Sequence, residues 1–236
     1  MSIARPSMRA FLRKAVRKNS RQDVRLRLSM AGSSCVRDLY YRATGAPSEA
    51  VSDERLMKMA IGAALDEIAL RHADGFRALA HQPVVVRMGD FAVHGTADLV
   101  LVDEHGPALV SDLKVVGDET WARVKNAPKP EHRSQVNLCA FGLGSARWSV
   151  CYVHAGSGEI LEHFGDTDAF AAKRDFGQFE EVGYWLGKRE PPPRPYEDVT
   201  LEDGTQKLAR DQFPCRFCPH RSHCWETKEG SNVPVS

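Results

Sequence analysis

Asp98, Asp112 and Lys114 have the side chains and the spacing to hold a divalent cation beside a reacting group. Side chains alternate along a strand, so Asp112 and Lys114 share one face of the predicted strand 108–116. If the chain turns symmetrically about His105, Asp98 lies opposite Asp112 on the preceding strand. Two opposed carboxylates destabilise a hairpin, and a cation between them removes that repulsion. Mg²⁺ or Mn²⁺ suits such a pair, because both bind carboxylates while keeping water and phosphate ligands.

Lys114 is then placed to orient or deprotonate an attacking water, or to contact a phosphate. The alternative interpretation is an exposed ion pair between Asp112 and Lys114, with Asp98 as an ordinary turn residue. The apolar residues around Asp98 favour the cation site, because an isolated acid rarely begins an otherwise apolar strand.

The elements that must position these residues follow from the pattern along the chain. Helices are predicted over 6–29, from Ser33–Ser34 to Tyr41, from 52–54 to His72, over 131–143 and over 166–186. Short β-branched runs at 84–88, 91–95, 98–102 and 108–116 predict antiparallel strands, and 148–153 predicts another. Residues 117–133 read as a mobile loop, and 191–195 as a proline-rich linker. The expected class is α/β (α+β), a mixed and mainly antiparallel sheet flanked by helices.

Asp98 followed by Asp112-Leu-Lys114 resembles the core motif of the PD-(D/E)XK nuclease superfamily. Within it, the chain is similar to the RecB-like and CRISPR-associated iron–sulfur exonucleases. The resemblance implies a restriction-endonuclease-like core and a DNA exonuclease that uses Mg²⁺ or Mn²⁺. It implies hydrolysis of phosphodiester bonds to leave a 5′-phosphate and a 3′-hydroxyl, with Asp98, Asp112 and Lys114 at the catalytic centre.

Two further motifs carry this resemblance onto the flanking helices. The family has G-x-x-x-H-E before the sheet, and here the matching stretch runs from Gly62 to Asp66-Glu67, with Asp66 in the histidine position. The third metal ligand is therefore expected to be Asp66 or Glu67, since a carboxylate binds a hard cation readily. The family also has Gln-x-x-x-Tyr after the lysine strand. Gln135 fits as a residue that supports the site, and Cys139 replaces the tyrosine as a packing residue.

Cys215, Cys218 and Cys224 form a C-x2-C-x5-C cluster, which is typical of a metal site. One local interpretation is Zn²⁺ bound by these three thiolates and either His220 or His223. In the iron–sulfur nucleases, however, one cysteine lies far upstream and three lie near the C-terminus. The resemblance therefore implies a [4Fe–4S] cluster that Cys35, 180 residues before Cys215, completes. Such a cluster would have a structural role and no part in hydrolysis.

The charge of the chain is unevenly distributed. Residues 1–29 hold nine Lys or Arg and one acid, a net +8, whereas the whole chain is +1 and the remainder therefore −7. This asymmetry predicts an anionic partner, DNA, although a solvated helix face is the plainer interpretation. The predicted DNA-contacting residues are Arg13, Arg17, Lys18 and Arg21 in the basic segment, with Trp121 and Lys125 in the loop.

No apolar run reaches the roughly 20 residues that span a membrane, and no secretory signal is present, so a cytoplasmic protein is expected. An Arg-rich N-terminus leaves a mitochondrial transit peptide open. The expected organisation is one nuclease domain over 1–225: a basic segment (1–45), the core (46–190) and the cysteine cluster (191–225), followed by a disordered tail (226–236). The alternatives are a nuclease that trims spacers with CRISPR-adaptation or recombination proteins, and a non-catalytic DNA-binding module that retains the metal cluster.

Overall fold

The computed structural model describes residues 14–15, 25–71, 77–203 and 205–226; within the third helix, the side chains at 54, 65, 66, 69 and 70 are not described. The helices are η1 (Leu28–Met30), α2 (Val36–Thr44), α3 (Asp53–Arg71), α4 (Asp118–Val124), α5 (Pro130–Leu143), α6 (Ala169–Lys188), η2 (Ala209–Asp211), η3 (Cys215–Phe217) and α7 (Arg221–Glu226). The strands are β1 (Ala78–Met88), β2 (Phe91–Asp103), β3 (Gly106–Val116), β4 (Arg147–His154), β5 (Ile160–Asp166), β6 (Val199–Thr200) and β7 (Gln206–Lys207).

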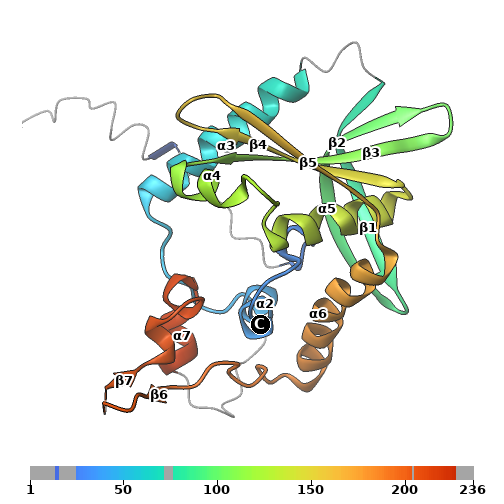
Figure 1. The fold of residues 1–236 in the computed structure, drawn as a ribbon. Helices are drawn as coiled ribbons and strands as arrows, with labels where there is room; N and C mark the ends of the chain where they lie inside the picture. The colour runs from blue at the N-terminus through green and yellow to red at the C-terminus, as the bar shows by residue number, and fades with distance from the viewer. Residues whose placement is uncertain (1–13, 16–24, 72–76, 204, 227–236) are drawn as a thin grey trace, which may run out of the picture.

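Strands β1 to β5 form one sheet in chain order, and β6 pairs with β7 in a separate hairpin. Every pair in the large sheet is antiparallel except β3 with β4, which run parallel. Parallel neighbours need a long connection, and α4 and α5 supply it. Helix α5 packs across the sheet against β1, β3 and β4, while α6 contacts α5 and α2 (Figure 1). The expected mixed, mainly antiparallel sheet flanked by helices is confirmed.

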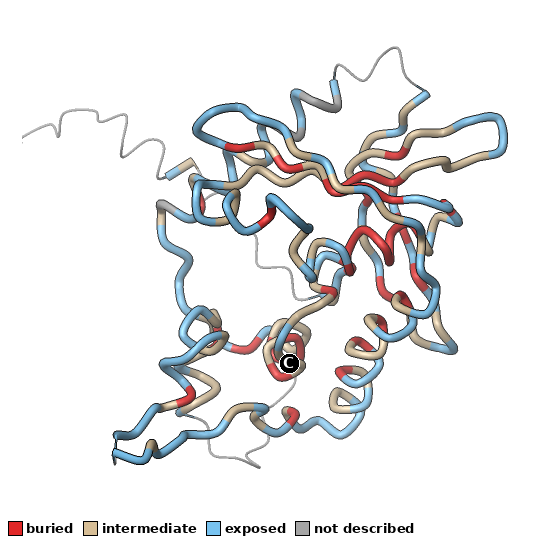
Figure 2. Tube along the Cα trace, viewed as in Figure 1, coloured by how far each residue is buried: buried red, intermediate tan, exposed pale blue. Residues whose placement is uncertain are grey.

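The hydrophobic core lies between the sheet and α5, where Figure 2 shows buried residues along both layers. The buried strand residues are largely β-branched and include Val84, Val86, Val100, Val110 and Val150, which meet Leu138 and Cys139 of α5. A second buried cluster, centred on Tyr40 and Tyr41, joins α2 to α6. Helix α2 therefore packs against two parts of the chain: α6 in this cluster, and the C-terminal segment (residues 191–226) described below.

The predicted strands 91–95 and 98–102 were wrongly separated, because they are one continuous strand, β2. Gly95 lies within this strand and packs closely on η1: a Cβ there would lie 2.7 Å from Cβ of Leu28. The predicted mobile loop 117–133 is also wrong, since it contains α4 and the first turn of α5. The strand β5 was missed, and the helix expected from 166 begins at Ala169, after Asp168 caps it through Phe170 N and Ala171 N.

Three other helix predictions are compared with the structure here, one of which falls mostly outside the described residues. Cys35, not Ser33–Ser34, is the N-cap of α2. Helix α3 is largely exposed, with Met59 at 62%, and Ser52 caps its start by accepting a hydrogen bond from Arg55 N. Most of the basic helix expected over 6–29, and the tail after Glu226, fall outside the described residues. Over the described part of the chain, no helix has both the length and the apolarity to cross a membrane.

Candidate active site

The β2–β3 hairpin sets Asp98 beside Asp112. Leu99 pairs with Ser111, so the next position of the same register places Asp98 opposite Asp112, as the sequence predicts. The turn itself is not symmetric about His105: Asp103 pairs with Gly106, and a β-bulge between Leu101 and Val102 restores the register. The bulge therefore decides which residues face each other at the site. Asp98 is further held by its Oδ2, which accepts a hydrogen bond from Leu113 N at 2.9 Å.

Asp112, Lys114 and Gln135 form one connected network. Lys114 Nζ lies 2.9 Å from each carboxylate oxygen of Asp112 and donates to Oδ1. Gln135 Nε2 donates to the same Oδ1 at 2.8 Å, while its Oε1 lies 3.4 Å from Lys114 Nζ. Alternation along β3 brings the aspartate and the lysine to the face that α5 covers, and α5 supplies the glutamine. The sheet and the helix thus converge on one carboxylate.

The carboxylate of Asp112 is buried, with 5% of its side chain exposed. Burial raises the pKa of Asp112 to about 7, and the nearby Asp98 carboxylate raises it further, while Lys114 opposes the shift. Both oxygens of this buried carboxylate are within 2.9 Å of Lys114 Nζ. Two carboxylates that face each other across a hairpin, one of them buried, are oxygen donors of the kind that a hard divalent cation binds. Asp98 and Asp112 therefore fit Mg²⁺ or Mn²⁺.

The third metal ligand is not decided by the geometry. Asp66 belongs to α3, whose residues contact β3, but its side chain lies outside the described set. The carboxylate of Glu67 is largely exposed and pairs with Arg71 one helical turn later. Among the described residues, no group of three or more His, Cys, Asp or Glu side chains is arranged to hold a single ion. The described part of the site is thus a two-carboxylate centre.

Sequence reasoning missed a layer of support directly behind Lys114. Tyr152 on β4 pairs with Lys114 in the parallel register. Its hydroxyl accepts from Lys129 N at 3.1 Å and lies 2.8 Å from His132 Nδ1, so it fixes the first turn of α5. Burial and the charges of Lys114 and Lys129 lower the pKa of His132 to about 4, which keeps its imidazole neutral. The one available signal was that His132 precedes Gln135 by three residues, one helical turn.

The predicted DNA-contacting residues are only partly described. Trp121 belongs to α4, and its ring packs on that of His154 at 5.2 Å, so it contributes to the core instead of standing free. Lys125 is exposed just after α4. The basic residues Arg13, Arg17, Lys18 and Arg21 lie outside the described residues. Cys139 is buried, as expected of a packing residue, and burial raises its thiol pKa to about 12.

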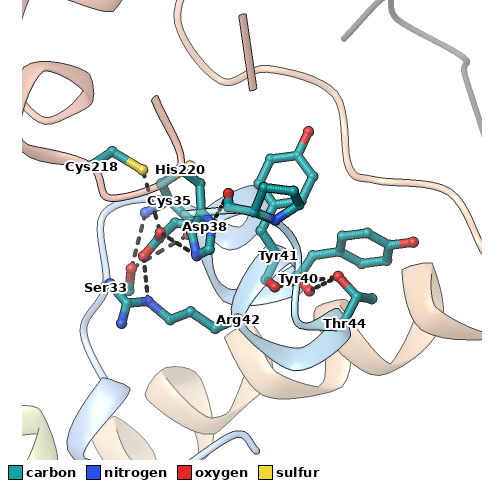
Figure 3. A network of polar contacts seen from close by, with 10 residues as sticks. Ser33, Cys35, Asp38, Tyr40, Tyr41, Arg42, Thr44, Cys218 and His220 are labelled. Carbon is teal, nitrogen blue, oxygen red and sulfur yellow. Dashed lines mark hydrogen bonds and ion pairs between the residues drawn. The ribbon is translucent and has the colours of Figure 1, made fainter. Parts of the chain in front are cut away.

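The cysteines Cys35, Cys215, Cys218 and Cys224 line one cavity of about 200 Å³ between α2 and the C-terminal segment. Figure 3 shows the part of this region around Asp38, whose Oδ1 accepts from Cys218 Sγ at 3.3 Å. The 180 residues between Cys35 and Cys215 are bridged by the fold, as the upstream-cysteine prediction requires. Cys151, by contrast, lies on β4 away from this cavity, with its thiol pKa raised to about 11 by burial.

The lining of this cavity carries four sulfur donors. His220 is also engaged elsewhere, since its Nδ1 lies 3.1 Å from the carbonyl of Pro47 and its Nε2 3.9 Å from Asp38 Oδ1. Burial raises the pKa of the Cys35 thiol, and the backbone N–H groups of Asp38 and Arg37 oppose this shift. Among the described residues, which include all four of these cysteines, no group of three or more His, Cys, Asp or Glu side chains is arranged to hold a metal ion.

Comparison with known proteins gives likenesses of fold alone. No family model matches the chain, and no curated protein is found as a relative. The crystal structure of SSO0001 is similar over 96% of this chain and 98% of that one, with a TM-score of 0.58 and 12% identity. The alkaline exonuclease LHK-Exo from Laribacter hongkongensis matches with a TM-score of 0.47 and 12% identity, over 71% of this chain and 94% of that one. A phage-related exonuclease from Haemophilus somnus 129PT gives 0.47 and 11%, over 70% and 94%.

Proposed function

We propose that this protein is a metal-dependent deoxyribonuclease of the PD-(D/E)XK type, acting on DNA ends as an exonuclease. The observation that carries the proposal is the convergence of Asp98, Asp112, Lys114 and Gln135 on one partly open centre. A structural ion pair between Asp112 and Lys114 would not need a second carboxylate opposite the first. Asp98, Asp112 and Lys114 follow one another along the hairpin, and Gln135 lies on α5. This order matches the PD-(D/E)XK nuclease motif.

Each side chain has a separate task in phosphodiester hydrolysis. Asp98 and Asp112, with Asp66 as the proposed third ligand, would hold Mg²⁺ or Mn²⁺. The cation supplies charge neutralisation at the scissile phosphate and makes water a better nucleophile near neutral pH. The side chain of Lys114 is one quarter exposed, and its ammonium, next to Asp112, would orient the water or contact the phosphate. Gln135 fixes both partners, because it donates to Asp112 and accepts from Lys114.

The test compares wild type with Asp112→Ala on end-labelled single- and double-stranded DNA in the presence of Mn²⁺. Glu104→Gln is the matched control, because Glu104 lies exposed in the turn of the same hairpin. We expect wild type and the control to shorten the DNA from its ends and Asp112→Ala to leave it intact. Equal degradation by wild type and Asp112→Ala would refute the catalytic role of this centre. A wild type that binds DNA without cutting it would instead identify a non-catalytic module.

We also propose that the cavity lined by the four cysteines holds a [4Fe–4S] cluster that ties α2 to the C-terminal segment. Its support is that the fold brings four sulfurs to one cavity, Cys35 from the start of α2 and the other three from the C-terminal segment. Protein purified without oxygen should be brown and contain iron and sulfide, and Cys218→Ser should lose both. Cys151→Ser is the control, because Cys151 lies on β4. Colourless wild type with one zinc per chain would refute the cluster and leave the nuclease proposal untouched.

A further inference from the structure

Arg37 is a buried cation with an incomplete set of partners. Only 3% of the residue is exposed. Its Nε donates to Tyr41 Oη at 2.9 Å and its Nη1 donates to the carbonyl of Pro192. Its Nη2 is buried and donates to none of the described residues, and no described acid forms an ion pair with Arg37. A buried guanidinium without a counter-charge is strongly destabilising.

The cavity next to Arg37 carries an excess of positive charge. Arg37 lines it together with the four cysteines. The other charged residues of its lining are four arginines and one acid: Arg42, Arg55, Arg194, Arg221 and Asp38. Asp38 is already engaged, because Arg42 Nε donates to its Oδ2 at 2.8 Å (Figure 3). Asp38 therefore does not neutralise the charge of Arg37, and the net positive charge of the lining favours an anion in the cavity.

The thiols are placed to provide that negative charge. Cys35, Cys215, Cys218 and Cys224 line the same cavity as Arg37, so a metal bound there would have their sulfurs as ligands. A metal centre held by four thiolates is a net anion, since the four ligand charges exceed the charge of a [4Fe–4S] or zinc core. Such a centre in this cavity would lie within the field of a buried guanidinium and would be screened little by solvent.

We propose that Arg37 is the built-in counter-ion of an anionic metal–thiolate centre in the cavity between α2 and the C-terminal segment. This inference rests on the proposed cluster and deepens it. Arg37 acts through charge and is a positioning residue: it touches no DNA and takes no part in hydrolysis. In the metal-free protein its charge is uncompensated, and in the loaded protein it stabilises the anion. Its contribution to stability therefore changes sign when the centre is filled.

That change of sign is the test. Arg37→Gln removes the charge and keeps a hydrogen-bonding side chain, and Arg37→Lys keeps the charge. Arg221→Gln is the matched control, because Arg221 lines the same cavity with 38% of its side chain exposed. Thermal unfolding is measured for metal-free protein and for protein reconstituted with iron and sulfide under anaerobic conditions. We expect Arg37→Gln to unfold at or above the wild-type temperature when metal-free and below it when loaded, whereas Arg37→Lys and Arg221→Gln follow wild type.

A second readout does not depend on the stability of the variant. Removing a nearby positive charge makes the addition of an electron less favourable, so redox titration with dithionite should give Arg37→Gln a more negative midpoint potential than Arg37→Lys. Equal destabilisation of the metal-free and loaded forms, or an unchanged potential, would show that Arg37 acts only through its hydrogen bonds to Tyr41 and Pro192, and would overturn the proposal.

The two proposals fail separately. Wild type that takes up zinc and no sulfide refutes the iron–sulfur cluster, and the same stability comparison is then made with zinc, whose four-thiolate complex is also an anion. A change of sign with zinc supports Arg37 as the counter-ion, and its absence refutes that role. Wild type that binds neither iron nor zinc refutes both.

Discussion

Replacing Asp112 with asparagine should abolish the nuclease and at the same time stabilise the metal-free protein. The folded-state pKa of Asp112 is about 7, against an ordinary value of 3.8. The folded protein therefore retains a proton that the unfolded chain releases, and stability falls as pH rises between these values. Asparagine imitates the protonated carboxyl and removes this dependence. About three pH units at about 1.4 kcal/mol each give an upper limit of roughly 4 kcal/mol for the gain at pH 8.

Urea denaturation in EDTA at pH 8 and pH 5.5 measures this gain directly. At pH 5.5 only about half of the interval between the two pKa values has been crossed, so the advantage of Asp112→Asn over wild type should fall to about half. Adding Mn²⁺ should stabilise wild type and leave the variant unchanged, since binding to the folded state alone raises the free energy of unfolding. An Asp112→Asn protein less stable than metal-free wild type at pH 8 would refute the argument from burial.

Three other substitutions test the surroundings of the site. Tyr152→Phe leaves His132 Nδ1 without its hydroxyl partner and should cost about 2 kcal/mol on urea denaturation and slow DNA hydrolysis; unchanged stability would contradict the supporting role. Gly95→Ala forces a Cβ onto Leu28 and should cost about 1–3 kcal/mol, whereas an alanine that folds with wild-type stability would show that the contact yields easily. Glu67→Ala should retain Mn²⁺-dependent activity, because its carboxylate is exposed; loss of Mn²⁺ binding by isothermal titration calorimetry would make it the third ligand.

The amino-acid sequence determined the local features of this protein for a physical reason. Alternation along β3 depends only on the geometry of one strand, so the shared face of Asp112 and Lys114 was predictable. The position of Asp98 opposite Asp112 followed from the length of the hairpin. The β-bulge between Leu101 and Val102 was not predictable from the sequence. The C-x2-C-x5-C spacing likewise predicted a metal site in the C-terminal segment from local sequence alone, and this stays a prediction.

Only the tertiary structure decided what depends on contacts between distant segments. The burial that raises the pKa of Asp112 comes from packing α5 against the sheet, and no pattern within β3 encodes it. Tyr152 supports the site because β4 lies parallel to β3, a pairing made through the helical connection. In the sequence, nothing distinguishes Arg37 from the other basic residues. It becomes a buried cation only when Pro192 and the C-terminal cysteines pack against α2. Charge and spacing are properties of the chain, whereas burial and partnership are properties of the fold.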